Sequence, residues 1–247
     1  MEAWQLLRHN QPVEALEVMR ATFNADRASP SVAIELGAIY MWLQEWESAW
    51  KHFCDFRTAC KQSMDIVYVL AGTARWCARD HTSAIQEWND GRTAAYTDGA
   101  GGVRIPLHLY FAAVCHPDSI DESDAIDLLK NRLNSLRGHQ WPSHLARLVL
   151  NEVSYDEALA AGLQASEHLE GDRLRQFQEF ETLRVRFWNG VKKRASGNEI
   201  GFLEEMDQCG AFTWNDFENN EELTIDRLRS SEFHLARSLS TREGALE

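Results

Sequence analysis

Small and aromatic residues recur in the first third of the chain at a spacing of 34–35 positions. The recurring positions are Ala15 and Met19 in one unit, Leu36, Gly37, Tyr40, Ala49 and Phe53 in the next, and Ala71, Gly72, Ala84 and Trp88 in a third. In each unit the small residue and the large one four positions later fall on the same face of a helix. Repetition at this period predicts stacked pairs of antiparallel helices.

Two glycines in this pattern indicate where the helices of a pair cross. Gly37 and Gly72 fall in the first helix of their units, where glycine costs about 1 kcal/mol relative to alanine. A position that accepts this cost in successive units predicts a close approach of two helix backbones. Ala15, Ala49 and Ala84 are the expected small contacts on the second helices.

The order Leu-Gly-x-x-Tyr over 36–40, then Ala-x-x-x-Phe over 49–53, resembles the tetratricopeptide repeat family. Pro30 stands before this unit, where that family often ends a repeat. The resemblance is strongest over residues 30–92. It implies a right-handed superhelix of helical hairpins whose concave face, built from the first helices, binds peptides or proteins.

Weaker traces of the pattern continue to the end of the chain. They include Ala125 with Leu129, Ala146 with Ala158, and the run 187–209, and a final helix is expected over about 220–239 as a solvent-facing cap. We therefore predict an all-α solenoid of five to six helix pairs with a C-terminal capping helix. The array is expected to span 1–247, with a sub-boundary near 163–172 that separates N-terminal repeats (1–163) from a C-terminal repeat and cap (172–247). The glycine-rich segment 94–102 is expected to be a wide turn braced by Tyr96, Thr97 and Asp98.

Composition excludes several classes of protein. The chain has 14 Gly and 5 Pro in 247 residues, too few for a turn-rich β fold. Its 25 basic and 38 acidic residues give a net charge of −13, which argues against binding to nucleic acids or anionic membranes. The five cysteines are irregularly spaced without a C-x-x-C pair, so we expect no disulfide framework, no zinc site and a cytoplasmic location.

Residue patterns typical of catalysis do not occur in the sequence. It contains no G-x-S-x-G, H-E-x-x-H or P-loop motif. His139 with His144, and His108 with His116, come nearest to metal-ligand spacing, but neither pair is four residues apart. We therefore expect no cofactor, and an all-α enzyme is the least favoured reading.

The expected function is protein–protein interaction through the concave groove. Trp42 and Trp76 fall at or near the inner edge of first helices, where exposed aromatics act as binding anchors. The further residues assigned to this face are Ile34, Met41 and Thr73, with Arg147, Arg184 and Arg194 extending it toward the C-terminal half.

Acidic residues between 195 and 232 support an alternative. Ten Asp and Glu lie there against two Arg, among them Glu204, Glu205, Asp207, Glu221, Glu222 and Glu232. They are either the solvated faces of helices next to basic neighbours or a docking surface for a basic protein. In the second case the protein is an immunity protein or inhibitor that occludes a basic toxin or enzyme.

Self-association through the N-terminal edge is also open. Trp4, Leu6 and Leu7 place apolar side chains in the first expected helix, which has no preceding unit to cover it.

Overall fold

The computed structural model describes residues 2–9, 11–60, 63–135, 137–165, 167–211 and 230–240 and is helical throughout, with no strand among them. The helices of the N-terminal part are α1 (Glu2–Arg8), α2 (Pro12–Ala25), α3 (Pro30–Trp42), α4 (Trp46–Ala59), α5 (Asp65–Cys77) and α6 (His81–Asp90). A short 3₁₀ turn, Gly91–Thr93, follows α6. The prediction of an all-α fold is thus confirmed for the described residues.

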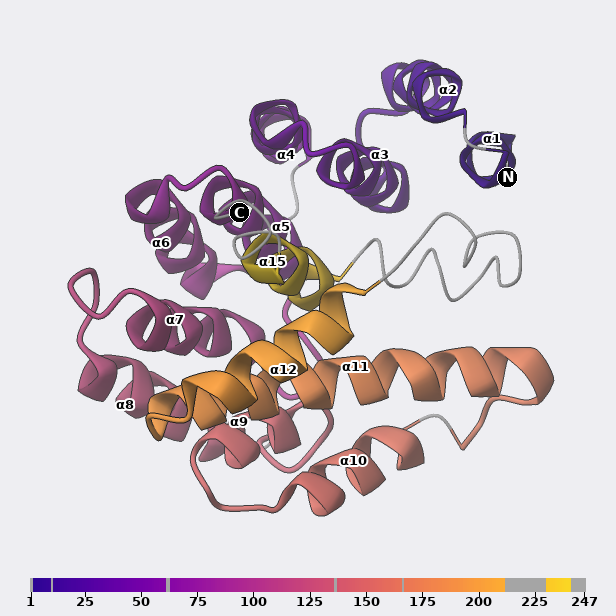
Figure 1. Cartoon of the computed structure of the whole chain (residues 1–247). Helices are drawn as coiled ribbons and strands as arrows, with labels where there is room; N and C mark the ends of the chain where they lie inside the picture. The colour runs from indigo at the N-terminus through magenta and orange to yellow at the C-terminus, as the bar shows by residue number, and fades with distance from the viewer. Residues whose placement is uncertain are drawn as a thin grey trace.

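The remaining helices are α7 (Arg104–Cys115), α8 (Glu122–Leu133), α9 (Ser143–Val149), α10 (Tyr155–Gln164), α11 (Gly171–Ala195), α12 (Glu199–Gly210) and α15 (Ser231–Ser240). Each helix from α1 to α12 packs against the next one along the chain, and α1 to α10 follow an arc (Figure 1). α11 runs beside α10, and α12 leads from the region of α8 to α15 in the middle of the molecule (Figure 1). The break between α10 and α11 falls at the predicted sub-boundary, and the division into two parts stays a prediction.

The turns that end first helices share one backbone conformation. Gln44 follows α3 and Arg79 follows α5, with φ of 60° and 66°, and these residues lie 35 positions apart. Asn151 repeats the conformation after α9, with φ of 60°. A left-handed residue after a helix end satisfies the last free carbonyls and turns the chain back. The 35-residue period of the sequence is therefore also a period of turn geometry.

The glycines are close-approach positions, as the spacing predicts. A Cβ built on Gly37 would lie 2.1 Å from Cζ of Phe53, and one on Gly72 would lie 2.3 Å from Nε1 of Trp88. Each ring belongs to the second helix of the same pair, and both rings are fully buried. The separation of four residues from Ala49 to Phe53, and from Ala84 to Trp88, thus places the aromatic ring against the glycine of the first helix.

Replacement of Gly72 with Ala is expected to lower the free energy of unfolding by about 2–3 kcal/mol, because an added methyl group overpacks the crossing. It would also push the Trp88 indole away from the Val69 carbonyl oxygen, to which Nε1 donates over 3.1 Å. Urea unfolding measures the change. Gly190→Ala is the matched control. Its Cβ would meet Cε of Met206, the end of a flexible side chain, and would lie 3.0 Å from Cβ of Glu205, a smaller overlap than that with the Trp88 ring, so a change below about 1 kcal/mol is expected. Equal effects of the two variants would contradict the close crossing.

The glycine-rich segment is a braced turn, as expected. The Asp98 carboxylate accepts hydrogen bonds from the backbone N–H groups of Ala100, Gly102 and Arg104 over 3.0, 2.9 and 2.7 Å. Gly101 and Gly102 have φ of 81° and 98°, which favours glycine. The turn therefore places the start of α7.

The C-terminal helix does not form a solvent-facing cap. Every residue from Ser231 to Ala236 is buried. Phe233 belongs to the apolar cluster of α1–α5, whereas Leu235, Ala236 and Leu239 belong to the cluster of α5–α12. The expectation of a solvating cap is therefore wrong for this helix, because it joins the two cores; residues 220–229 lie outside the described part.

Candidate binding site on the inner face

The inner face of the arc holds α15. This helix packs on α5, α11 and α12 and lies inside the arc (Figure 1). Residues of α15 form hydrogen bonds with Trp42 of α3, Cys77 of α5, His108 of α7 and Arg184 of α11. Each of these four helices is the first helix of its pair. First helices form the inner side, so α15 occupies the face on which the sequence predicts a partner.

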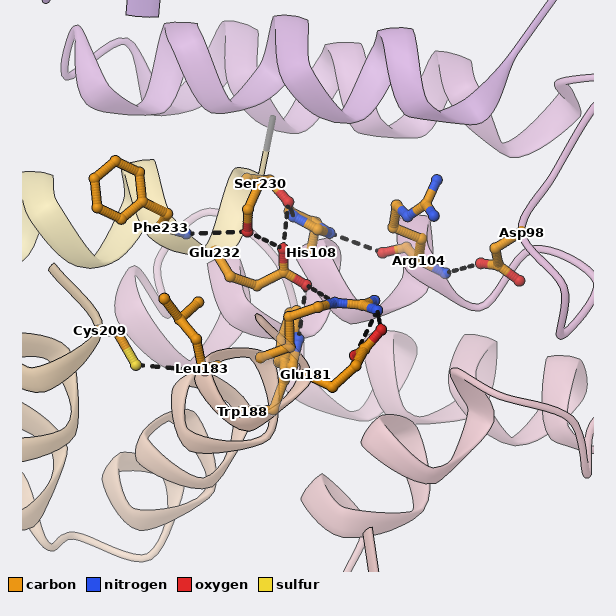
Figure 2. A network of polar contacts seen from close by, with 12 residues as sticks. Asp98, Arg104, His108, Glu181, Leu183, Trp188, Cys209, Ser230, Glu232 and Phe233 are labelled. Carbon is orange, nitrogen blue, oxygen red and sulfur yellow. Dashed lines mark hydrogen bonds and ion pairs between the residues drawn. The ribbon is translucent and has the colours of Figure 1, made fainter. Parts of the chain in front are cut away.

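The centre of this site is a buried cluster of charges. Oε1 of Glu232 accepts hydrogen bonds from Nε of Arg184 over 3.3 Å and Nε1 of Trp188 over 3.2 Å (Figure 2). Arg184 also donates to both carboxylate oxygens of Glu181, over 3.2 and 3.1 Å. The Arg184 and Glu232 side chains are only 10% and 6% exposed. Charges desolvated to this degree are stable only when their partners are in place.

The charge states follow from this geometry. Burial alone would raise the pKa of Glu232, but the Arg184 guanidinium and nearby His108 hold that pKa well below its ordinary value. Burial raises the pKa of Glu181, and Arg184 offsets only part of that rise. Burial would lower the pKa of Arg184, whereas Glu181 and Glu232 raise it above its ordinary value. Arg184 and Glu232 thus form an ion pair at neutral pH.

Two serines and a histidine surround the second oxygen of this carboxylate. Oε2 of Glu232 accepts from the hydroxyls of Ser230 and Ser231, each over 3.0 Å. Ser230 Oγ also accepts from the backbone N–H of Phe233 over 3.3 Å, so it caps the start of α15 (Figure 2). Oγ of Ser231 lies 2.9 Å from Nε2 of His108 as well, and its single hydrogen serves one of the two acceptors at a time.

His108 is an uncharged core histidine. Its Nδ1 lies 2.8 Å from the carbonyl oxygen of Arg104, and this acceptor places the ring proton on Nδ1. The ring lies between the indoles of Trp88 and Trp188, with centroids 5.3 and 5.6 Å away. Burial lowers the pKa of His108 to about 4, and Glu232 offsets only part of this effect.

Contacts with Trp42 hold Phe233, which follows Glu232 in the first turn of α15, and Arg237 in the last turn. The Phe233 ring stacks on the Trp42 indole at 6.1 Å with 17° between the planes. The Arg237 guanidinium lies 4.4 Å from the centroid of the same indole and donates to the Trp42 carbonyl oxygen over 3.1 Å. Glu232 and Phe233 thus contact two helices that are far apart in the sequence, α11 and α3.

The aromatic residues assigned to an exposed groove lie in the interior. Trp42 is 5% exposed because Phe233 and Arg237 cover it. Trp76 is 2% exposed and lies among His81, Trp88 and Phe111. The expected exposure of these two anchors is wrong, because α15 covers Trp42 and because Trp76 packs against α6 and α7.

The aliphatic and hydroxyl positions of the predicted groove differ among themselves. Met41 and Thr73 are fully buried, and the Thr73 hydroxyl donates to the Val69 carbonyl oxygen over 2.8 Å. Ile34 is half-buried against the N-terminal cluster. Whether these residues reach a partner stays a prediction.

The three predicted arginines are not brought together. Arg184 lies at the centre of the site, whereas Arg147 pairs with Glu152 over 2.7 Å. Arg194 pairs with Glu199 over 3.3 Å and covers the Phe202 ring. Of the three arginines that were predicted to extend the binding face, only Arg184 therefore belongs to the candidate site.

The acidic surface is divided. Glu204 and Asp207 are exposed on α12, but Glu205 accepts from Asn189 over 2.9 Å and from Lys193 over 2.7 Å. Glu221 and Glu222 lie outside the described residues. Glu232, assigned from sequence to the acidic stretch, is buried, which corrects that assignment because it is the ion-pair partner of Arg184.

Sequence reasoning missed most of the residues of this site. They are His108, Glu181, Trp188, Ser231, Glu232, Phe233 and Arg237. The one local signal was Ser230 before the apolar residues 233–236, a typical N-cap position.

Among the described helices, none is long and apolar enough to cross a membrane.

Comparison of the sequence with protein-family models, and with curated proteins and solved structures, finds no match.

Proposed function

We propose that the protein is a non-enzymatic binding module, a superhelix of tetratricopeptide-like hairpins that holds a helical segment of a partner protein on its inner face. The observation that carries the proposal is α15 itself. A helix seats there with a carboxylate on Arg184 and an aromatic ring on Trp42. Helix-in-groove binding uses such anchors, with side chains at fixed register on one helix.

One further observation supports the repeat architecture, and another supports a function without catalysis. The left-handed turn residues Gln44 and Arg79 and the glycine crossings at Gly37 and Gly72 recur at the same 35-residue spacing. The hydroxyl–imidazole pair of Ser231 and His108 is buried and covered by two indoles, which supports a structural use of these groups rather than nucleophilic catalysis.

Hydrogen exchange on a reconstituted complex tests the proposal. The chain is first used to isolate stoichiometric partners from its native host, and the strongest is produced separately and recombined with the pure chain. We expect the exchange rates of α5, α7, α11 and α15 to change when the partner binds, because the first three helices line the inner face and α15 covers it. Protection confined to α2, α4, α6 and α8 would contradict the proposal, and protection confined to α12 would favour docking on its exposed carboxylates, Glu204 and Asp207.

A further inference from the structure

Building on the proposed function, we infer that α15 occupies, within its own chain, the site on the inner face where a partner helix binds. We also infer that this site selects a partner helix with a carboxylate side chain followed directly by an aromatic one. Such a helix would take the place of α15. The inference therefore names both the class of partner and the segment that competes with it.

The polar character of the α15 contact supports selection rather than permanent packing. Ser230, Ser231, Glu232 and His234 are buried in this contact beside the apolar Phe233, Leu235, Ala236 and Leu239, so half of its buried residues are polar. Polar surfaces are typical of interfaces that form and separate, whereas permanent ones resemble an apolar core. A buried ion pair adds little net stability, but it strongly disfavours an occupant that lacks one partner.

The receiving groups define what a competing helix must carry. Arg184 and Trp188 both donate to one oxygen of Glu232, over 3.3 and 3.2 Å. A side chain without an acceptor there would leave two buried donors unpaired, and a neutral amide would leave the Arg184 guanidinium without one of its two opposite charges. Trp42 offers its face to Phe233 at the α3 end. Adjacent residues on a helix point in directions about 100° apart, and this divergence lets one helix reach both anchors.

The length of the chain permits exchange. α12 ends at Gly210 and α15 begins at Ser231, so 20 residues connect them. Fully extended, a connection of this length spans at most about 70 Å. α15 could therefore leave the inner face while α12 stays folded. Because the helix is tethered, its effective concentration is high, on the order of millimolar, and free peptides compete poorly with it in the intact chain.

A labelled peptide with the sequence of residues 230–240 and blocked ends is the probe, and fluorescence anisotropy measures its binding to the full chain. We expect weak binding to the unmodified chain and at least tenfold tighter binding to the Phe233→Ala chain, whose own helix is weakened. Arg184→Met added to Phe233→Ala should abolish the gain. Peptides that carry Gln in place of Glu232, or Ala in place of Phe233, should bind at least tenfold more weakly.

Two results of this experiment would overturn the inference. One is a Phe233→Ala chain that keeps its helical circular dichroism but binds the peptide no better than the unmodified chain. The other is equal binding of the parent and substituted peptides.

A second experiment covers a Phe233→Ala chain that fails to fold. A site-specific protease sequence is inserted between Asn219 and Asn220 of the otherwise unmodified chain, and the connection is cut after folding. We expect native mass spectrometry to show the C-terminal fragment retained and then replaced by excess labelled peptide. A fragment that never exchanges, or a body that loses helicity after the cut, would show that α15 is a permanent core element. Neither outcome depends on an external partner, so failure here is distinguishable from failure of the proposed binding function.

Discussion

Replacing Arg184 with Met is expected to lower the free energy of unfolding by about 3–5 kcal/mol at pH 7, because it removes one partner from a buried ion pair. Glu181 and Glu232 both depend on this guanidinium and are 2% and 6% exposed at their side chains. Without it, two desolvated carboxylates face each other and must take up protons or admit water. Urea unfolding followed by far-ultraviolet circular dichroism measures the loss.

Arg147→Met is the matched control for this prediction. Arg147 also pairs with a glutamate, Glu152, but both side chains are partly exposed, at 31% and 40%. Solvent screening makes such a pair worth less than about 1 kcal/mol. If the two variants lost the same small amount, the Arg184 cluster would behave as a surface ion pair, and its role as the centre of the site would be wrong.

The sequence predicted the local part of this structure well. The 35-residue spacing identified the crossings at Gly37 and Gly72 because each involves neighbouring helices of one hairpin, with the ring of the second helix 16 residues further on. Such contacts leave a periodic trace in one chain. The braced turn at Asp98 is equally local, since its three hydrogen bonds reach residues two to six positions away.

The candidate site is not local, and this is why the exposure of Trp42 and Glu232 was predicted wrongly. The contact of Arg237 with the Trp42 carbonyl spans 195 positions, and that of Ser231 with His108 spans 123. A periodic pattern of hydrophobic positions carries no information about contacts between elements so far apart in the sequence. Glu232 illustrates the point: next to many other acidic residues it has the pattern of a solvated face, and only the position of Arg184 gives it a partner inside the protein.

Acidification is expected to weaken the packing of α15 through His108. Burial lowers the pKa of this histidine to about 4 from its ordinary value of 6.5. Between these values the unfolded chain binds a proton that the folded chain does not, so stability is lost as the pH falls through this range. From pH 7 to pH 5 this one group accounts for about 2 kcal/mol.

The charged groups around His108 determine how far this trend extends. Arg104 on its own helix and Arg184 on α11 disfavour its protonation, whereas Glu232 on α15 favours it. Glu232 itself has a lowered pKa, so its stabilising charge is lost only below its ordinary value of 4.5, after His108 has begun to act. The raised pKa values of Asp65 and Glu181 act in the opposite direction, because these buried carboxyl groups take up protons more readily in the folded chain.

His108→Gln separates this histidine from the other titrating groups. The amide keeps a polar group near Ser231 but does not titrate, so the variant is expected to be less stable at pH 7 and to lose about 2 kcal/mol less than the unmodified chain between pH 7 and pH 5. Urea unfolding at half-unit pH intervals gives both curves. His52, which is also buried and also has a lowered pKa, remains in both chains, and its contribution cancels in the difference. Parallel curves would mean that His108 reaches solvent in the folded protein, which is incompatible with α15 covering the inner face.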